Sequence, residues 1–299
     1  MRRILIGCGI ACLVVIVMLV VGGIAVGSWV RSQVDTKQVE SLHAELEKRF
    51  GSAESWVPPL DGKLDPARVA LFAAVRDSIA AGRRVAAADF STFMHVVGRN
   101  RPEGRPALEK LLDVVSTARN GTTMATSMVK YFTTQERVLL DNGMGPGEYR
   151  YLYCTAYFAW LQWDPMAKPE VRDALQRANM LQEVETARAR YGRLLRGQLE
   201  NQRRDLEAKT VRTPAEDAEL SLLKAELEDV AKTERFPFIG RLPATTTAAL
   251  EPHRARLEAT LPQDAAEIAL DLFRAARKRG GGFNIDFDDR SGSAGRGTQ

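Results

Sequence analysis

The first 30 residues constrain this chain more than any other stretch. No charged residue occurs from Ile4 to Val30, a run of 27 residues. A helix rises 1.5 Å per residue, and about 20 apolar residues are enough to cross the hydrocarbon core of a bilayer. The run therefore predicts one transmembrane helix over residues 4–30, with the lipid bilayer as its partner and residues 1–3 as a short tail.

The charges on either side of this run predict its orientation. Arg2 and Arg3 precede it, whereas the basic residues that follow are offset by Asp35 and Glu40. Positive charge favours the cytoplasmic side of a membrane segment. We therefore expect a cytoplasmic N-terminus and an extracytoplasmic location for the rest of the chain.

Two other interpretations of the same run are possible. Ala25-Val26-Gly27 offers small residues for signal-peptide cleavage, and Leu5-Ile6-Gly7-Cys8 matches a lipobox by letter. The apolar run is far longer than the 7–15 residues typical of a signal peptide. It also continues well past Cys8. The length therefore favours a retained anchor over both alternatives.

Composition excludes few classes of function. The chain has 299 residues, of which 45% are apolar and 27% charged, with a net charge of +4. Its basic residues are interleaved with acids, and no nucleic-acid-binding motif accompanies them, so we expect no nucleic-acid partner. Cys154 is the one cysteine outside the apolar run, and it does not indicate a redox compartment.

Helical periodicity dominates the remaining sequence and predicts an all-α fold. We expect a juxtamembrane helix over residues 31–51 and an extracytoplasmic multi-helix bundle over residues 52–279. Pro58-Pro59 predicts a turn, and Asp65-Pro66 is typical of a helix start. Residues 280–299 are rich in Gly and Ser, which predicts a disordered tail.

The second half of the bundle contains the pattern for a long helical hairpin, residues 168–233. Apolar residues recur at steps of three and four after Lys168-Pro169, which predicts the longest helix of the chain. Thr213 and Glu216 form a capping-box pattern that predicts the start of the returning helix. We interpret this hairpin as a surface for a protein partner and expect an exposed apolar patch on it.

The stretch between residues 107 and 141 predicts an interrupted helix. Asn120-Gly121 is a weak point, because glycine is a poor helix former. Thr133 and Glu136 repeat the capping-box spacing and predict the start of a further helix. Asn142-Gly143 and Pro146 then predict a helix end followed by a new start.

Sequence patterns for chemistry are missing. The chain lacks an HExxH motif, a CxxC pair, a P-loop and a nucleophile elbow, and its three histidines have no ligand neighbours at metal spacing. We therefore assign no catalytic residue, no cofactor-binding residue and no metal ligand, and we expect no cofactor.

An aromatic segment between Tyr149 and Trp163 is the strongest candidate for a binding site. Its spacing predicts one face of an α-helix, most simply the central helix of the core. The alternative is a cavity for a lipid or quinone-like ligand. The tyrosine hydroxyls need partners, for which we expect Glu148, Arg150 and Gln162. The candidate ligand cluster is Tyr149, Tyr153, Tyr157, Trp160 and Trp163.

Two stretches resemble signatures of an uncharacterised family of bacterial proteins. They are "WVPPLDGKLDPARVALFAAVRDSI" and "GMGPGEYRYL". Members of this family have one N-terminal membrane helix and a helical body. The resemblance implies a bacterial source and an envelope location. Together with the predicted membrane helix and its orientation, this predicts a bacterial inner-membrane protein with its body in the periplasm. It implies no activity and no functional residues.

These observations lead to three hypotheses. The first is a non-enzymatic scaffold or partner-binding module of the bacterial envelope. The second is a binder of a small apolar ligand at the aromatic segment. The third, weaker hypothesis is an enzyme with an unrecognised site near Glu148 and Tyr149.

Overall fold

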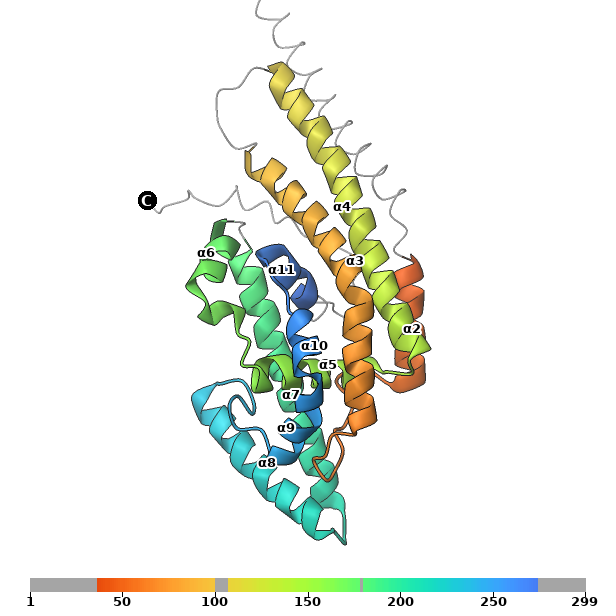
Figure 1. Ribbon diagram of the computed structural model, residues 1–299, viewed down its shortest axis with the longest axis vertical. Helices are drawn as coiled ribbons and strands as arrows, with labels where there is room; N and C mark the ends of the chain where they lie inside the picture. Colours follow the sequence, from red (N-terminus) through yellow and green to blue (C-terminus); the bar gives the residue numbers. More distant parts are fainter. Residues whose placement is uncertain (1–36, 100–106, 178–179, 274–299) are drawn as a thin grey trace, which may run out of the picture.

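The protein is built from α-helices, as the periodicity predicts. The computed structural model describes residues 37–99, 107–177 and 180–273, and these ranges contain no β-strand (Figure 1). Their elements, in chain order, are α2 (Lys37–Phe50), α3 (Pro66–Arg99), α4 (Ala107–Asp141), α5 (Pro146–Tyr153), a π-helix η1 (Cys154–Trp160), a 3-10 turn η2 (Pro165–Ala167), α6 (Pro169–Arg177), α7 (Leu181–Ala208), α8 (Pro214–Thr233), α9 (Ala244–Leu250), a 3-10 turn η3 (Glu251–His253), α10 (Arg254–Ala259) and α11 (Ala265–Phe273).

Helices α3 and α4 form an antiparallel pair that is longer than any other in the described residues. They contain 34 and 35 residues, and one end of the pair projects beyond the other helices (Figure 1). The prediction that the longest helix begins at Lys168 was therefore wrong. The seam between α3 and α4 is closed by the buried side chains of Phe90, Phe93, Met124 and Met128.

Helix α4 is continuous, although the sequence predicted an interruption. A Cβ atom at Gly121 would lie 3.3 Å from the ring of Phe93 on α3, so glycine allows this aromatic ring to pack closely. Thr133 and Glu136 lie inside α4 with buried side chains and do not start a helix. Packing against neighbouring helices therefore outweighs the local preference of these residues.

The chain around α2 is part of the packed body. Val39 and Leu46 are fully buried, and α2 contacts α4 and α5. The helix ends where Gly51 adopts a φ of +80°, a conformation that glycine adopts without steric cost. The juxtamembrane helix predicted for residues 31–51 is thus helical from Lys37 to Phe50.

The junction before α5 follows the predicted cap and proline start. Gly143 has a φ of +59°, and the amide of Met144 donates to the carbonyl of Leu139 at 2.9 Å, which closes α4. Pro146 occupies the first turn of α5. A Cβ atom at Gly147 would lie 2.3 Å from the Cβ of Trp56, so this glycine lets α5 approach the loop between α2 and α3.

The long hairpin predicted for residues 168–233 is shorter in the structure. Helix α6 is a separate element, because the amide of Met180 donates to the carbonyl of Leu175 at 2.9 Å and closes it. The antiparallel hairpin consists of α7 and α8 (Figure 1). Its predicted capping box is confirmed. The amide of Thr213 donates to Oε2 of Glu216 at 2.8 Å, and the amide of Glu216 donates to Oγ1 of Thr213 at 3.3 Å.

Several predictions concern residues outside the described ranges. These are the tail 1–3, the transmembrane segment 4–30, residues 31–36 and the terminal tail 280–299. Among the helices within residues 37–99, 107–177 and 180–273, none is long and apolar enough to cross a membrane.

Helix α11 lies at the centre of the body. It packs against α3 on one side and α7 on the other (Figure 1). Most of its side chains are buried, among them Ile268, Leu270 and Leu272. Two acidic residues, Glu267 and Asp271, are buried with them. Helix α11 therefore brings carboxylates into the apolar core.

Candidate functional site

The aromatic segment forms the core of the protein. Its residues from Tyr149 to Ala159 are all buried. Tyr153 is in edge contact with Tyr157, with ring centroids 4.8 Å apart, and its ring centroid lies 5.3 Å from that of Tyr191 on α7. Such aromatic pairs stabilise a core beyond their buried area. The interpretation of this segment as the central core helix agrees with its burial.

The segment does not remain an α-helix along its length. It changes at Cys154 from α5 to the π-helix η1, in which the amide of Leu161 donates to the carbonyl of Ala156 at 2.9 Å. The wider π turn changes the helical spacing that placed all five predicted residues on one face. The prediction of a regular α-helix through Trp163 was therefore wrong.

The structure brings four of the five predicted residues together and separates the fifth. Tyr149, Tyr153 and Tyr157 lie in consecutive ring contacts, and the ring of Trp163 lies 6.5 Å from that of Tyr157. Trp160 is partly exposed, and the guanidinium of Arg254 lies 4.3 Å from its ring centroid.

The hydroxyls of Tyr149 and Tyr157 form hydrogen bonds with residues distant in sequence. Tyr149 accepts hydrogen bonds from Arg76 at 3.0 Å and from Gln135 at 3.2 Å. Tyr157 accepts one from Nε of Arg76 at 2.9 Å, and its oxygen lies 2.8 Å from Oγ1 of Thr260. These partners differ from the residues expected from sequence, Glu148, Arg150 and Gln162, whose contacts with the tyrosine hydroxyls stay a prediction. The apolar-ligand hypothesis stays a prediction.

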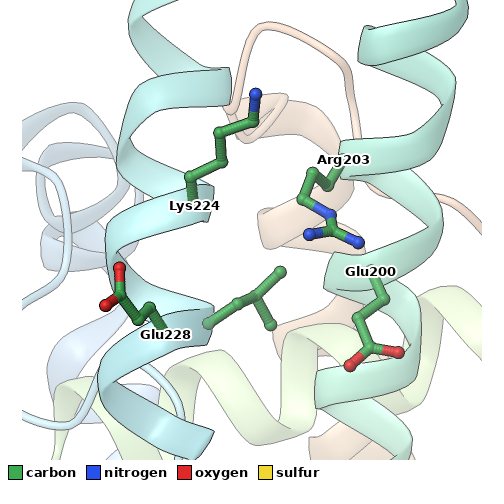
Figure 2. Close-up of a pocket in the computed structure, with 5 residues that line it drawn as sticks. Glu200, Arg203, Lys224 and Glu228 are labelled. Atoms are coloured by element: carbon green, nitrogen blue, oxygen red, sulfur yellow. The ribbon is translucent and has the colours of Figure 1, made fainter.

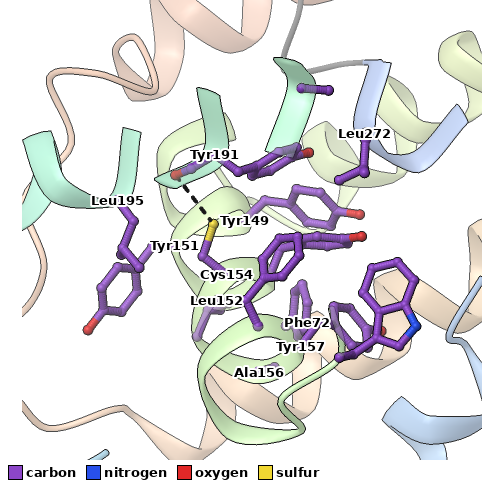
Figure 3. Packing of buried hydrophobic residues seen from close by; sticks show 14 of the residues in the cluster. Phe72, Tyr149, Tyr151, Leu152, Cys154, Ala156, Tyr157, Tyr191, Leu195 and Leu272 are labelled. Atoms are coloured by element: carbon purple, nitrogen blue, oxygen red, sulfur yellow. Dashed lines mark hydrogen bonds between the residues drawn. The ribbon is translucent and has the colours of Figure 1, made fainter. Parts of the chain in front are cut away.

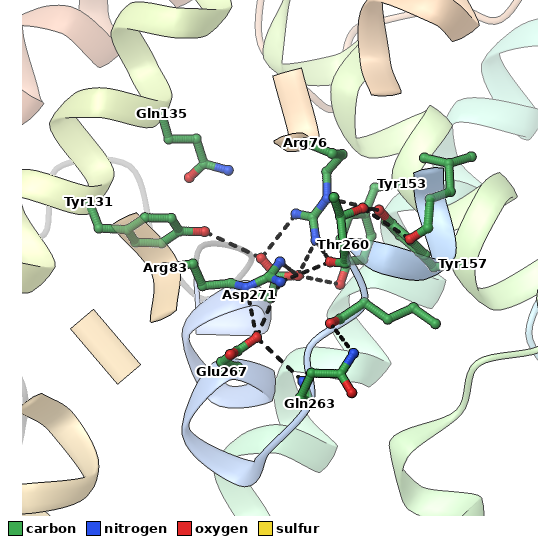
Figure 4. Close-up of polar contacts among 12 residues, drawn as sticks. Arg76, Arg83, Tyr131, Gln135, Tyr153, Tyr157, Thr260, Gln263, Glu267 and Asp271 are labelled. Atoms are coloured by element: carbon green, nitrogen blue, oxygen red, sulfur yellow. Dashed lines mark hydrogen bonds and ion pairs between the residues drawn. The ribbon is translucent and has the colours of Figure 1, made fainter. Parts of the chain in front are cut away.

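Arg76 is the hub of this polar cluster. Its side chain is 0% exposed, and it makes five hydrogen bonds. A guanidinium has five N–H donors, so all of them are used. Two of these bonds, of 3.1 and 2.7 Å, form a fork to the carboxylate of Asp271 (Figure 4). The side chain of Arg76 also lies 5.0 Å above the ring of Tyr157.

Asp271 is the acceptor at the centre of the cluster, and its side chain is 1% exposed. Arg83 donates to its Oδ2 at 3.2 Å, next to the fork from Arg76. The hydroxyls of Tyr131 and Tyr153 donate to its two oxygens at 3.3 and 3.2 Å (Figure 4). Two arginines and two phenols thus surround one carboxylate.

The charges of the cluster are balanced by a second carboxylate. Glu267 accepts a hydrogen bond from Nε of Arg83 at 3.2 Å. Arg83 also donates to the carbonyl of Thr260 at 2.9 Å. The cluster therefore contains two cations and two anions, and it links α3 and α4 to α5, η1 and α11. We name it the buried polar cluster: Arg76, Arg83, Tyr131, Tyr149, Tyr153, Tyr157, Thr260, Glu267 and Asp271.

Burial and charge act in opposite directions on Asp271. Burial by itself raises the pKa of this carboxyl, but the two adjacent guanidinium groups outweigh it and lower the pKa from 3.8 to about 2. The pKa values of Tyr131 and Tyr153 are well above the ordinary value because burial disfavours the phenolate. Each group is thus fixed in its usual charge state at neutral pH.

Cys154 lies in the same core without reactive character. Its thiol donates to the carbonyl of Tyr191, with 3.9 Å between sulfur and oxygen (Figure 3). Burial raises its pKa far above the ordinary value. Because the thiolate is the nucleophilic form, this burial disfavours chemistry at Cys154.

The two residues of the enzyme hypothesis have different partners. Glu148 binds Arg68, whose Nε donates to its Oε1 at 2.6 Å. Tyr149 binds Arg76 and Gln135 in the buried polar cluster. An unrecognised catalytic role at Glu148 and Tyr149 stays a prediction. Among the described residues, no group of three His, Cys, Asp or Glu side chains could hold a metal ion.

The outer side of the α7–α8 hairpin has an open depression of about 370 Å³. Figure 2 shows Arg203 and Glu200 on α7 opposite Lys224 and Glu228 on α8. The remaining lining residue is Leu227. Lys224 pairs with Glu207 at 3.1 Å, and Glu228 pairs with Lys232 at 2.7 Å.

Arg203 differs from the other charged residues that line the depression. Its Nε is buried and has no hydrogen-bond partner in the described part of the chain. A buried donor without an acceptor is costly. The Nε atom is itself covered by the protein, so a molecule in the depression does not reach it.

The expected apolar patch on the hairpin is missing. The apolar stripes of α7 and α8 are buried, including Leu195, Leu199 and Leu223. Among the described residues between 168 and 233, the large exposed hydrophobic side chain is Val211, 81% exposed in the turn between the two helices. A partner of this hairpin would thus meet a polar surface.

Sequence reasoning missed the residues that organise the interior. Arg76 and Arg83 are seven residues apart and fall on the buried face of α3, near Phe72 and Ile79. Asp271 lies within the apolar sequence of α11. A charged residue on an apolar helical stripe is a signal for a buried pair, because such a residue needs a partner.

The comparisons with known proteins give no relative. No protein-family model, no curated protein and no solved structure matches this chain. The family resemblance of the two quoted stretches therefore stays untested.

Proposed function

We propose that this protein is a membrane-tethered, extracytoplasmic partner-binding module of the bacterial envelope, and that the α7–α8 hairpin binds the partner. The tether is the apolar run from Ile4 to Val30, which is long enough to span a bilayer. The body is the helical domain that follows it. No catalytic step is part of the proposal.

The charged lining of the α7–α8 depression carries this proposal. Arg203 and Lys224 both line this surface depression. A carboxylate or carbonyl oxygen of a partner bound there would lie near these two positive charges. By contrast, the charged groups of the buried polar cluster are closed off from the surface, so they offer no contact to a binding molecule.

The chemistry of the depression defines the partner. Arg203 and Lys224 favour an acidic side chain, whereas Glu200 and Glu228 favour a basic one nearby. A polypeptide segment with neighbouring acidic and basic side chains satisfies both pairs. Leu227 adds a small apolar contact between them. We therefore expect a protein partner with a mixed-charge segment.

Affinity capture of the full chain from solubilised membranes tests the role of the hairpin. The test variant is Arg203→Glu combined with Lys224→Glu. The control is Lys48→Glu combined with Lys130→Glu, which changes the net charge equally at exposed positions on α2 and α4. We expect wild type and control to capture the same protein, and the hairpin variant to lose it at least about tenfold, a change of about 1.4 kcal/mol in binding.

Two results would contradict the proposal. One is a hairpin variant that retains every protein captured by the wild type. The other is a wild-type sample that captures no protein absent from an untagged preparation. Thermal unfolding of both variants checks that the loss of capture does not come from a loss of folding.

Reporter fusions test the tether and its orientation. A reporter that is active only outside the cytoplasm, fused after Gln299, is expected to be active in the membrane fraction. Activity of a cytoplasm-only reporter at the same position would contradict the orientation. Recovery of the fusion in the soluble fraction would contradict the tether.

A further inference from the structure

We propose that a segment of this chain's own C-terminal tail, Asp286 to Arg290, docks in the depression of the α7–α8 hairpin and competes there with the partner protein. The competition rests on the proposed function, because it needs a partner at the same site. The docking itself requires no partner, so either proposal can fail without the other.

The tail segment has the charge pattern that the depression requires. Its sequence is Asp-Phe-Asp-Asp-Arg, in which three acidic residues precede a basic one. The depression is lined by two cations, Arg203 and Lys224, and by two glutamates (Figure 2). Acidic side chains of the tail would approach the two cations, and Arg290 would approach the glutamates. Residues 274–299 contain no other acidic residue, so this match selects the segment.

The charges that line the depression are available for such contacts. Arg203 and Glu200 form no ion pair within the described part of the chain. Lys224 pairs with Glu207 at 3.1 Å, but the two side chains are 54% and 39% exposed. Ion pairs between exposed side chains contribute little free energy. The tail can therefore recruit Lys224 at low cost.

The tail begins beside the same helix that lines the depression. The hydroxyl of Tyr191 on α7 donates to the carbonyl of Asp271 at 3.3 Å, two residues before α11 ends at Phe273. Figure 1 shows α11 alongside α7. The depression begins at Glu200, nine residues further along α7, and this distance is roughly 14 Å at 1.5 Å per residue.

The chain between α11 and the docking segment has a suitable length. Asp288 follows Phe273 by 15 residues, and this connection includes Gly280-Gly281-Gly282. A connection of this length reaches at most about 50 Å when fully extended and spans about 20 Å as a random coil. The second value is close to the distance along α7. Such a match gives effective concentrations in the millimolar range, so even a weak contact would be formed in much of the protein.

Two arginines lie on α7 between the start of the tail and the depression. Arg193 and Arg196 share the outer side of α7 with Glu200 and Arg203, at steps of three and four residues. Neither Arg193 nor Arg196 has an ion-pair partner among the residues that the structure describes. Two unpaired cations on this path attract an acidic segment toward the depression.

Photo-crosslinking within the purified full chain tests the docking. A photoreactive phenylalanine analogue would replace Phe287, in protein solubilised in mild detergent without any partner. We expect crosslinked peptides from α7 and α8 at the depression. The charge reversal Arg203→Glu with Lys224→Glu should lower their yield at least about tenfold. The control is Lys48→Glu with Lys130→Glu, at exposed positions on α2 and α4, and should keep the yield.

Charge reversal in the tail distinguishes a direct contact from an indirect one. Asp288→Lys combined with Asp289→Lys changes no residue of the helical body. It should remove the crosslink by itself and restore it when combined with Arg203→Glu and Lys224→Glu. No crosslink at the depression, a yield that the hairpin variant leaves unchanged, or no restoration would overturn the proposal. A crosslink that joins two chains, recognised by its doubled mass, would overturn docking within one chain.

Capture of the partner from solubilised membranes measures the competition. Replacement of Asp286, Asp288 and Asp289 by Asn removes the acidic charges of the tail. We expect this variant to capture about tenfold more partner than the wild type does, because the tail no longer occupies the depression. Equal or weaker capture would overturn the competition. Absence of capture by both proteins would refute the proposed function and with it the competition, whereas the crosslink would still decide the docking.

Discussion

The substitution Asp271→Asn is expected to destabilise the protein severely, because Asp271 is the acceptor shared by two buried cations. The change keeps the size of the side chain but removes its charge. It leaves Arg76 and Arg83, both 0% exposed, without their common anion. The amide NH2 group of the new asparagine would also place hydrogen-bond donors next to the N–H donors of the arginines, where no bond can form.

Two arguments give the magnitude of this loss. The lowered pKa of Asp271, about 2 against an ordinary 3.8, corresponds to roughly 2 kcal/mol between its charged and neutral forms. Removal of one partner from a buried ion pair costs roughly 3–5 kcal/mol. The larger value applies here, because an amide cannot accept the forked bonds of Arg76 as the carboxylate does.

Thermal unfolding followed by circular dichroism measures the effect. A loss of roughly 3–5 kcal/mol corresponds to a melting temperature lower by roughly 6–20 °C in a body of this size. The control is Asp217→Asn, which removes the same type of charge from an Arg212 pair at a side chain that is 59% exposed. It should cost less than about 1 kcal/mol. Equal shifts for the two variants would refute the reasoning.

Three further predictions concern pH and the glycine contacts. Because the pKa of Asp271 is lowered in the fold, its contribution of roughly 2 kcal/mol to the free energy of unfolding is complete above pH 4 and is lost as the pH falls toward 2. Acid unfolding of the wild type measures this loss, with Asp271→Asn as the insensitive control. Burial raises the pKa of Tyr153, so the contribution of its neutral phenol to stability is complete below pH 10 and declines above it. In an alkaline titration, tyrosinate absorbance should rise together with the loss of helix signal. Ionisation of the tyrosines while the protein is still folded would contradict this. Gly147→Ala should lower the free energy of unfolding by roughly 1–3 kcal/mol, because its Cβ would overlap Trp56. Gly197→Ala has open space at its Cβ and should raise the free energy of unfolding by roughly 0.5–1 kcal/mol. Denaturant unfolding measures both values, and the reverse order would contradict the prediction.

Local signals in the sequence predicted the places where helices begin and end. The amide of Ala67 donates to Oδ1 of Asp65 at 2.8 Å, as the Asp65-Pro66 start requires, and the Thr213 capping box is present. Such signals are reliable because their partners lie within three residues. The same pattern at Thr133 failed because burial against neighbouring helices outweighs a local cap.

The buried polar cluster could not be assembled from local patterns. The fork between Arg76 and Asp271 joins residues separated by 195 positions. Sequence can show that an arginine lies on an apolar stripe, but not which acid reaches it. The π-helix after Tyr153 was not predicted either, because the spacing of its aromatic residues fits an ordinary α-helix.

The surface was the least predictable part. Apolar steps along residues 168–233 were interpreted as an exposed contact, whereas the structure buries them in the hairpin and the body. Many of the charged residues between those steps face solvent, including Glu200 and Lys224. Periodicity identifies an apolar helix face that must be buried, but other helices of the same chain can bury it.

Site-specific photo-crosslinking in cells measures whether the α7–α8 hairpin contacts a partner protein. A photoreactive amino acid would replace Glu200, at the edge of the depression, and in a control would replace Ala244, exposed at the start of α9. The account predicts a covalent adduct with a second polypeptide at position 200 and none at position 244. No adduct at position 200, or the same adduct at both positions, would contradict it.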